Sequence, residues 1–232
     1  MKLPGVKAIA FDLDGTLCTY GVTIQEAIAG ALRRVGRPID LVGDLDEAAL
    51  RYDELWFEVE QKQGSVMLLR KQIWERLLSE HEVEGPGLAR KLAEQYTQIR
   101  VPSIHLFDGV RELLLDLGCI YRLGLLTNGP SDMQWPKIEH LGLRSLFKTI
   151  LVSGDVGLHK PDKHIFEALL NKLGITAKEA LYVGNSLEMD VVGAKSAGML
   201  SAWIRDGNDE DVGDMTPDIV LDNLCALREV LL

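Results

Sequence analysis

The sequence predicts an α/β fold in which a mostly parallel sheet carries helices on both faces and a helical domain is inserted into the chain. Two observations lead to this class. From residue 105 onward, short apolar runs alternate with helix-period segments, as in a parallel sheet covered by helices. A first apolar run, residues 6–12, fits the same sheet but is separated from the others by about ninety residues of helical pattern.

Six apolar runs are expected as strands. They span residues 6–12, 121–127, 148–153, 180–184, 200–204 and 218–221. Four segments among them place apolar residues three and four positions apart and end on a glycine that stops a helix. These segments are 109–118, 132–142, 163–174 and 188–198.

Residues 20–100 contain no convincing strand pattern. Their helix-period segments, separated by Gly or Pro, are 23–36, 45–63, 66–81 and 86–99. We expect an α/β domain of residues 1–18 and 104–232 and a helical domain of residues 19–103. The insertion follows the first strand, at whose carboxyl end open α/β sheets bind ligands. Trp56, Phe57 and Trp74 are expected in the core of the insertion.

Composition excludes several classes of partner. The chain has 232 residues and a formal charge of −10, which argues against nucleic acid because phosphate backbones are held by clustered Lys and Arg. The first apolar run is too short for a signal peptide or a membrane span. Three separated cysteines, Cys18, Cys119 and Cys225, indicate reduced thiols. We expect a cytoplasmic protein with no membrane contact.

The stretch AIAFDLDGTL places Asp12 and Asp14 directly after the first strand. Side chains two positions apart in an extended chain point the same way, so the two carboxylates are crowded together. A divalent cation such as Mg²⁺ would relieve them, or one would act as a nucleophile and the other as an acid and base. A turn with capping aspartates is the alternative, which the buried strand before them disfavours.

Polar side chains follow three further strands. Thr127 and Asn128 end one of them, Lys160 precedes a proline and a helix, and Asn185 and Asp190 begin another helix. Each pattern alone is typical of a turn, a helix start or a cap. Together they predict one crevice at the carboxyl edge of the sheet.

These four stretches resemble the four motifs of the haloacid dehalogenase (HAD) superfamily of hydrolases, in order and over nearly the whole chain. The resemblance implies a Rossmann-like catalytic domain with a helical cap domain inserted after its first strand. It also implies that Asp12 attacks phosphorus to give an aspartyl-phosphate. Asp14 would protonate the leaving oxygen and then activate water.

The resemblance assigns the remaining roles as well. Thr127 and the backbone amide of Asn128 would bind the phosphoryl oxygens, and Lys160 would supply positive charge and restrain Asp12. Mg²⁺ would be held by Asp12, the Asp14 backbone carbonyl, Asn185 and Asp190. The family usually has an aspartate where this chain has Asn185, so we expect weaker metal binding, with more of it falling on Asp190.

We therefore expect a Mg²⁺-dependent phosphatase that acts on a small phosphorylated metabolite. Two alternatives remain. One is a 2-haloacid dehalogenase, although the dehalogenases proper have a non-acidic residue in place of Asp14. The other is a weakly active, HAD-like binding or regulatory protein, suggested by Asn185. His159 either starts a helix or touches substrate. The sequence leaves the particular substrate and the oligomeric state open.

Overall fold

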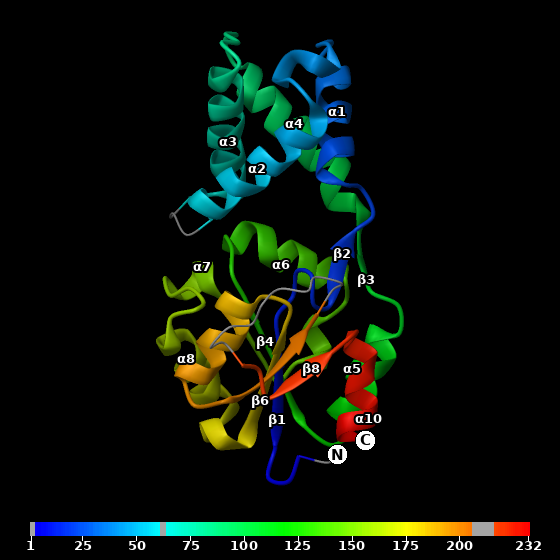
Figure 1. Ribbon diagram of the computed structural model, residues 1–232, viewed down its shortest axis with the longest axis vertical. Coiled ribbons are helices and arrows are strands. Elements are labelled where there is room, and N and C mark those ends of the chain that lie inside the picture. The colour runs from blue at the N-terminus through cyan, green and yellow to red at the C-terminus, as the bar shows by residue number, and fades with distance from the viewer. Residues whose placement is uncertain (1–2, 61–63, 206–215) are drawn as a thin grey trace. The chain divides into compact units, whose positions relative to one another are not determined.

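The computed structural model describes residues 3–60, 64–205 and 216–232. The chain forms two compact units, one of residues 1–19 and 106–232 and the other of residues 20–105 (Figure 1). We call them the core unit and the helical unit.

The core unit is built on a parallel sheet of order β5-β4-β1-β6-β7-β8. Its strands are β1 Ala8–Phe11, β4 Arg122–Thr127, β5 Thr149–Val152, β6 Ala180–Gly184, β7 Leu200–Ile204 and β8 Ile219–Leu221. The predicted α/β class and its parallel sheet are confirmed. Phe11 at the end of β1 lies opposite Leu125 of β4 and Val183 of β6. The carboxyl ends of these three strands therefore lie side by side.

Helices cover both faces of this sheet (Figure 1). They are α5 Val110–Gly118, α6 Ser131–His140, α7 Ser153–Val156, α8 Lys163–Leu173, α9 Gly193–Ser196 and α10 Leu227–Leu231. Helix α8 buries Phe166 and Leu169 against Ala10 of β1 and Tyr182 of β6. A Cβ at Gly124 would lie 3.1 Å from the Leu173 side chain, so the missing side chain lets α8 approach β4.

The helical unit contains α1 Ile24–Arg34, α2 Leu45–Val59, α3 Val66–Glu80 and α4 Leu88–Arg100. Capping side chains set where three of them begin, because they satisfy backbone amides that lack partners in the first turn. Thr23 forms a capping box with Glu26, and Asp44 and Ser65 cap α2 and α3. Residues 61–63 of the predicted helix 45–63 lie outside the described residues.

Aromatic rings fill the interior of the helical unit. Tyr52 stacks on Tyr96 with ring centroids 4.6 Å apart, and the fully buried Trp74 meets both rings edge-on. Trp56 packs partly buried against the same cluster. The expectation that Phe57 lies in this core is wrong, because its side chain is 51% exposed.

Two local features differ from the pattern-based prediction. Strands β2 Cys18–Tyr20 and β3 Ile104–Leu106 form a separate two-stranded sheet, and three residues are too few to show an alternating pattern. The expected α-helix 188–198 is a π-helix, η5 Leu187–Val192, followed by α9. π-Turns inside helices are frequent at functional sites.

The remaining helical turns are short 3₁₀ segments. They are η1 Ile39–Val42, η2 Val101–Ser103, η3 Arg144–Leu146, η4 Ala177–Glu179 and η6 Leu224–Ala226. Within the described ranges, none of the helices has the length and apolar character that crossing a membrane requires.

Candidate active site

The turn after β1 places the first carboxylate at the middle of the sheet edge. Asp12 extends the strand ladder, since its backbone N–H donates to the Val183 carbonyl at 3.0 Å, and the residue is only 7% exposed. Gly15 has a φ of +80°, which favours glycine. A Cβ there would lie 2.5 Å from the Asn185 amide nitrogen, so the turn packs directly against the loop after β6.

Lys160 joins two of the predicted carboxylates in a buried cluster. Its Nζ donates to Asp12 Oδ1 and to Asp190 Oδ1, each at 2.6 Å, and to the Tyr182 hydroxyl at 3.2 Å. The Tyr182 hydroxyl in turn donates to the Leu126 carbonyl at 3.1 Å. The structure thus brings together three side chains that lie far apart in the sequence and adds Tyr182, which the sequence analysis did not identify.

The charges in this cluster do not balance, because one ammonium serves two buried carboxylates. Burial raises the pKa of Asp12 to about 7; Lys160 opposes that rise, while Asp190 and Asp14 add to it. Burial alone would lower the pKa of Lys160, but Asp12 and Asp190 outweigh it and hold that pKa well above its ordinary value. These contacts favour the charged form of Lys160, and further positive charge near Asp12 would favour its carboxylate form.

The end of β4 is tied to Lys160 through Asn128. The Asn128 side-chain oxygen accepts from the Lys160 backbone N–H at 2.9 Å, and its amide nitrogen donates to the Lys160 carbonyl at 3.1 Å. Thr127 is 1% exposed, and its hydroxyl donates to the Asn128 carbonyl at 3.3 Å. The Asn128 side chain thus positions the loop that carries Lys160.

Asp14 belongs to a second ion pair, which the sequence analysis missed. Lys137 Nζ lies 2.8 Å from Asp14 Oδ1 and 2.9 Å from Oδ2, and Gln134 Nε2 donates to Oδ2 at 3.1 Å. Both side chains come from α6, where Met133, Gln134, Lys137 and Ile138 are buried. Two polar residues on an otherwise apolar helix face were the available signal in the sequence.

The loop after β6 holds Asn185 and Asp190 by different contacts. The Thr16 hydroxyl donates to Asn185 Oδ1 at 3.1 Å, and the Trp203 indole donates to the Asn185 carbonyl at 3.0 Å. Asp190 Oδ2 accepts from the Ser186 backbone N–H at 3.0 Å, so both of its oxygens are engaged. A Cβ at Gly184 would lie 2.2 Å from Asp190 Oδ2, which only glycine avoids.

The donors around Asp12 suit a hard divalent cation. Among the described residues no group of three or more His, Cys, Asp or Glu side chains could hold a metal, so backbone and amide oxygens must contribute. Asp12 Oδ2 accepts no hydrogen bond within the described part of the chain. Asn185 Oδ1 and the Asp14 carbonyl supply further oxygens of the type that Mg²⁺ prefers. The residues therefore fit the predicted ion, although Asp190 is turned toward Lys160.

Two other groups lie near this edge. Within the described part of the chain, His159 Nδ1 is buried and has no hydrogen-bond partner, and burial lowers the pKa of the ring. Burial raises the pKa of the Cys18 thiol, which donates to the Leu13 carbonyl, so this cysteine is not a thiolate.

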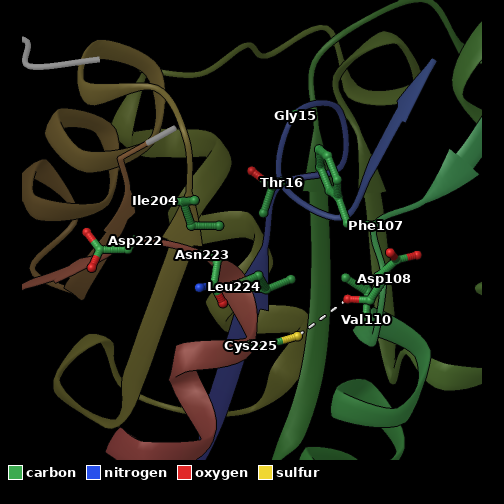
Figure 2. A pocket seen from close by; sticks show the side chains of 10 residues that line it. All are labelled: Gly15, Thr16, Phe107, Asp108, Val110, Ile204, Asp222, Asn223, Leu224 and Cys225. Atoms are coloured by element: carbon green, nitrogen blue, oxygen red, sulfur yellow. Dashed lines mark hydrogen bonds between the residues drawn. The ribbon is translucent and has the colours of Figure 1, made fainter. Parts of the chain in front are cut away.

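A mostly apolar pocket of about 350 Å³ in the core unit is lined in part by Gly15 and Thr16 of the turn after β1 (Figure 2). Thr16, Phe107 and Cys225 are among its lining residues, and the Cys225 thiol donates to the Asp108 carbonyl at 3.5 Å. None of the predicted site residues lines it.

A central parallel strand ends in the buried carboxylate of Asp12, and Lys160 and Asp190 lie against it on a Rossmann-like sheet. The family comparison agrees with this arrangement. The chain belongs to the haloacid dehalogenase-like hydrolases, whose family model matches residues 6–198.

Individual relatives extend over almost the whole chain. It is 32% identical to a glyceraldehyde 3-phosphate phosphatase of Methanopyrus kandleri, with 97% of this chain and 98% of the relative covered. The HAD-hydrolase YfnB of Bacillus subtilis, solved bound to magnesium, superposes with a TM-score of 0.73 at 25% identity and 97% coverage of each chain. A 2-haloacid dehalogenase of Pseudomonas syringae superposes with a TM-score of 0.68 at 26% identity and the same coverage.

Proposed function

We propose that this protein is a Mg²⁺-dependent phosphatase that hydrolyses small phosphorylated metabolites through an aspartyl-phosphate. The observation that carries the proposal is the pair of carboxylates on one turn, each with its own lysine: Asp12 with Lys160 and Asp14 with Lys137. The relationship to the glyceraldehyde 3-phosphate phosphatase supports a phosphate ester as substrate.

In the first half-reaction, a carboxylate oxygen of Asp12 bonds to phosphorus and the bond to the leaving oxygen breaks. Lys160 keeps the carboxylate oriented and stabilises the negative charge of the transferring group. Asp14 gives a proton to the leaving oxygen, and it then takes one from the water that releases inorganic phosphate from Asp12. Dividing the displacement into two steps lowers the barrier of a reaction that is extremely slow in water.

Asp12, the Asp14 backbone carbonyl, Asn185 and Asp190 are the residues that would hold the Mg²⁺. Both Asp190 oxygens accept hydrogen bonds, from Lys160 and from the Ser186 backbone. When bound, the ion neutralises charge on the phosphoryl oxygens. Thr127 and the Asn128 amide end the strand next to Asp12 and would bind the same oxygens. The helical unit is proposed as the cap domain, which would restrict access to the site.

A dehalogenase is the second candidate, because a 2-haloacid dehalogenase is among the similar structures and Asn185 replaces a usual metal ligand. Asp14 argues against it. An acid at this position protonates an alkoxide, whereas a halide leaves without a proton.

The test measures phosphate release from a panel of phosphorylated sugars, trioses including glyceraldehyde 3-phosphate, and nucleoside monophosphates, with Mg²⁺ and with a chelator. Chloride release from 2-chloropropionate is measured in parallel. We expect phosphate release that the chelator abolishes and that Asp12→Asn reduces more than about 1,000-fold, because the nucleophile is lost. Metal-independent chloride release, or full activity of Asp12→Asn, would refute the proposal.

A further inference from the structure

Helix α6 turns two polar side chains toward the site. Gln134 and Lys137 are three positions apart, hence on one face of the helix, and are only 1% and 3% exposed. Residues of these types are rarely buried unless they are paired, because removing them from water costs several kcal/mol. The groups that Gln134 and Lys137 contact therefore indicate why these two side chains are buried.

The partner of Lys137 is the carboxylate of Asp14, which it contacts through both oxygens, at 2.8 and 2.9 Å. The Lys137 side chain is 3% exposed, whereas that of Asp14 is 37% exposed. The ammonium thus approaches from the protein side and leaves the opposite side of the carboxylate open. An ammonium on both oxygens restricts rotation of the carboxylate more than a contact with one oxygen would.

Gln134 connects the same carboxylate to the end of β4. Its Nε2 donates to Asp14 Oδ2 at 3.1 Å and to the Asn128 carbonyl at 2.5 Å. Its Oε1 is buried and has no hydrogen-bond partner among the described residues, which costs about 1–3 kcal/mol. That cost is consistent with a side chain kept for orientation rather than for stability.

Two other residues of α6 fasten the helix to α7. The Trp135 indole donates to Asp155 Oδ2 at 2.9 Å, and the Ser131 hydroxyl donates to the other oxygen of the same carboxylate. The Arg144 guanidinium lies 5.3 Å from the centre of the Trp135 ring. Because these contacts hold α6 in place, Lys137 and Gln134 are preorganised before any substrate binds.

We propose that Lys137 and Gln134 are positioning residues that aim Asp14 for its two proton transfers; this inference rests on the proposed phosphatase function. In the first transfer, one Asp14 oxygen gives its proton to the oxygen leaving phosphorus while Lys137 retains the other. In the second, the Asp14 carboxylate takes a proton from the water whose oxygen bonds to phosphorus. The Asp12 carboxylate is thereby released, and inorganic phosphate leaves.

Esters with different leaving groups distinguish this positioning role from a merely structural one. An alkoxide needs a proton as it departs, whereas 2,4-dinitrophenolate departs without one. We expect Lys137→Met to lower kcat for the best alkyl phosphate of the panel by about 10- to 100-fold. With 2,4-dinitrophenyl phosphate and Mg²⁺, the variant should instead release close to one equivalent of dinitrophenolate per site in a fast burst. Slow steady turnover should follow, because only water activation is impaired.

Four further variants serve as comparisons for this result. Asp14→Asn should show the same burst with a slower steady rate, and Lys137→Arg should recover part of the alkyl phosphate activity because the charge remains. Lys172→Met, which removes an exposed lysine in the last turn of α8, is the matched control and should behave as the wild type. Gln134→Leu should also show the burst, with a smaller loss of kcat on the alkyl phosphate than Lys137→Met. If circular dichroism shows that Lys137→Met does not fold, Gln134→Leu is used to test the inference instead.

Two results would overturn the inference. One is a Lys137→Met enzyme with wild-type kcat on alkyl phosphates. The other is an equal loss on both esters with no burst, which would mean a general structural defect. A wild-type enzyme that releases phosphate from no ester would instead refute the proposed function itself, so the two failures are distinguishable.

Discussion

The core unit and the helical unit bury different kinds of side chain. Within the described residues, almost every buried polar or charged side chain lies in the core unit. These are Asp12, Thr16, Thr127, Gln134, Lys137, Ser153, Lys160, Asp190 and Ser201, whereas the helical unit contributes Arg70 alone. The helical unit instead buries an aromatic cluster around Trp74.

This difference shows that the core unit buries polar groups that the proposed chemistry needs, although burying them is unfavourable for stability. A buried charge is unfavourable unless an opposite charge and hydrogen bonds accompany it, and the core unit supplies these through Lys160 and Lys137. The helical unit gains stability from apolar area and ring contacts, which impose no such requirement. Substitutions in the core unit should therefore destabilise the fold by leaving buried polar groups unpaired, whereas substitutions in the helical unit should destabilise it by removing apolar contacts.

The largest effect is expected from Lys160→Met, which leaves Asp12 and Asp190 buried without their shared cation. Breaking a buried pair in this way costs about 3–5 kcal/mol, and phosphatase activity should disappear as well. Urea unfolding followed by circular dichroism measures the loss. Adding Asp190→Asn should restore part of the stability and none of the activity. If Lys160→Met were as stable as the wild type, the claim that the core unit depends on paired buried charges would be wrong.

A loss of similar size, with a different cause, is expected from Trp74→Ala in the helical unit. Truncating a fully buried tryptophan leaves a cavity and costs about 3–5 kcal/mol. Trp74→Phe should cost clearly less, because it keeps a ring and removes an indole N–H that is buried without a partner. Urea midpoints of both variants measure the difference. Equal losses of stability in Trp74→Ala and Trp74→Phe would mean that the indole itself, rather than the volume that it fills, stabilises the helical unit.

A smaller effect is expected from Tyr182→Phe in the core unit. The hydroxyl accepts from Lys160 and donates to the Leu126 carbonyl, so its removal leaves a buried carbonyl unsatisfied. We expect a loss of about 1–3 kcal/mol and a lower kcat, because Lys160 loses one of its three partners. Steady-state kinetics and urea unfolding measure both quantities. Wild-type stability and wild-type kcat of Tyr182→Phe would contradict the expected dependence of the core unit on paired buried polar groups.

The smallest effect concerns Asp218, at the edge of the core sheet. Burial would raise its pKa, but hydrogen bonds from the Ser201 backbone and hydroxyl, together with Lys195, hold it below the ordinary 3.8. A carboxyl with a lowered pKa stabilises the fold above pH 3.8, and this stabilisation is lost as pH falls through the folded-state pKa. Asp218→Asn should therefore cost less than about 1 kcal/mol at pH 7, and the difference should shrink as the pH falls below 3.8. Urea midpoints across this range test the sign.

Much of the core fold was predictable because local pattern and tertiary environment agree there. Strands β6 and β7 match their predicted bounds, and β1, β4, β5 and β8 differ by one or two residues. A buried parallel strand is apolar throughout, so its sequence is distinctive. The pattern failed where an element is only three residues long, as in β2, and where the helix after β6 widens into a π-turn around Asp190.

The sequence by itself determined that carboxylates, a lysine and amides would follow successive strands of a parallel sheet, because strand periodicity and turn residues are local properties of the chain. Only the tertiary structure decided how these groups pair. Lys160 reaches Asp12 and Asp190, and Lys137 reaches Asp14 across 123 positions of sequence. Such pairings depend on which helix faces which strand end, and that is set by packing between elements that carry no local record of one another.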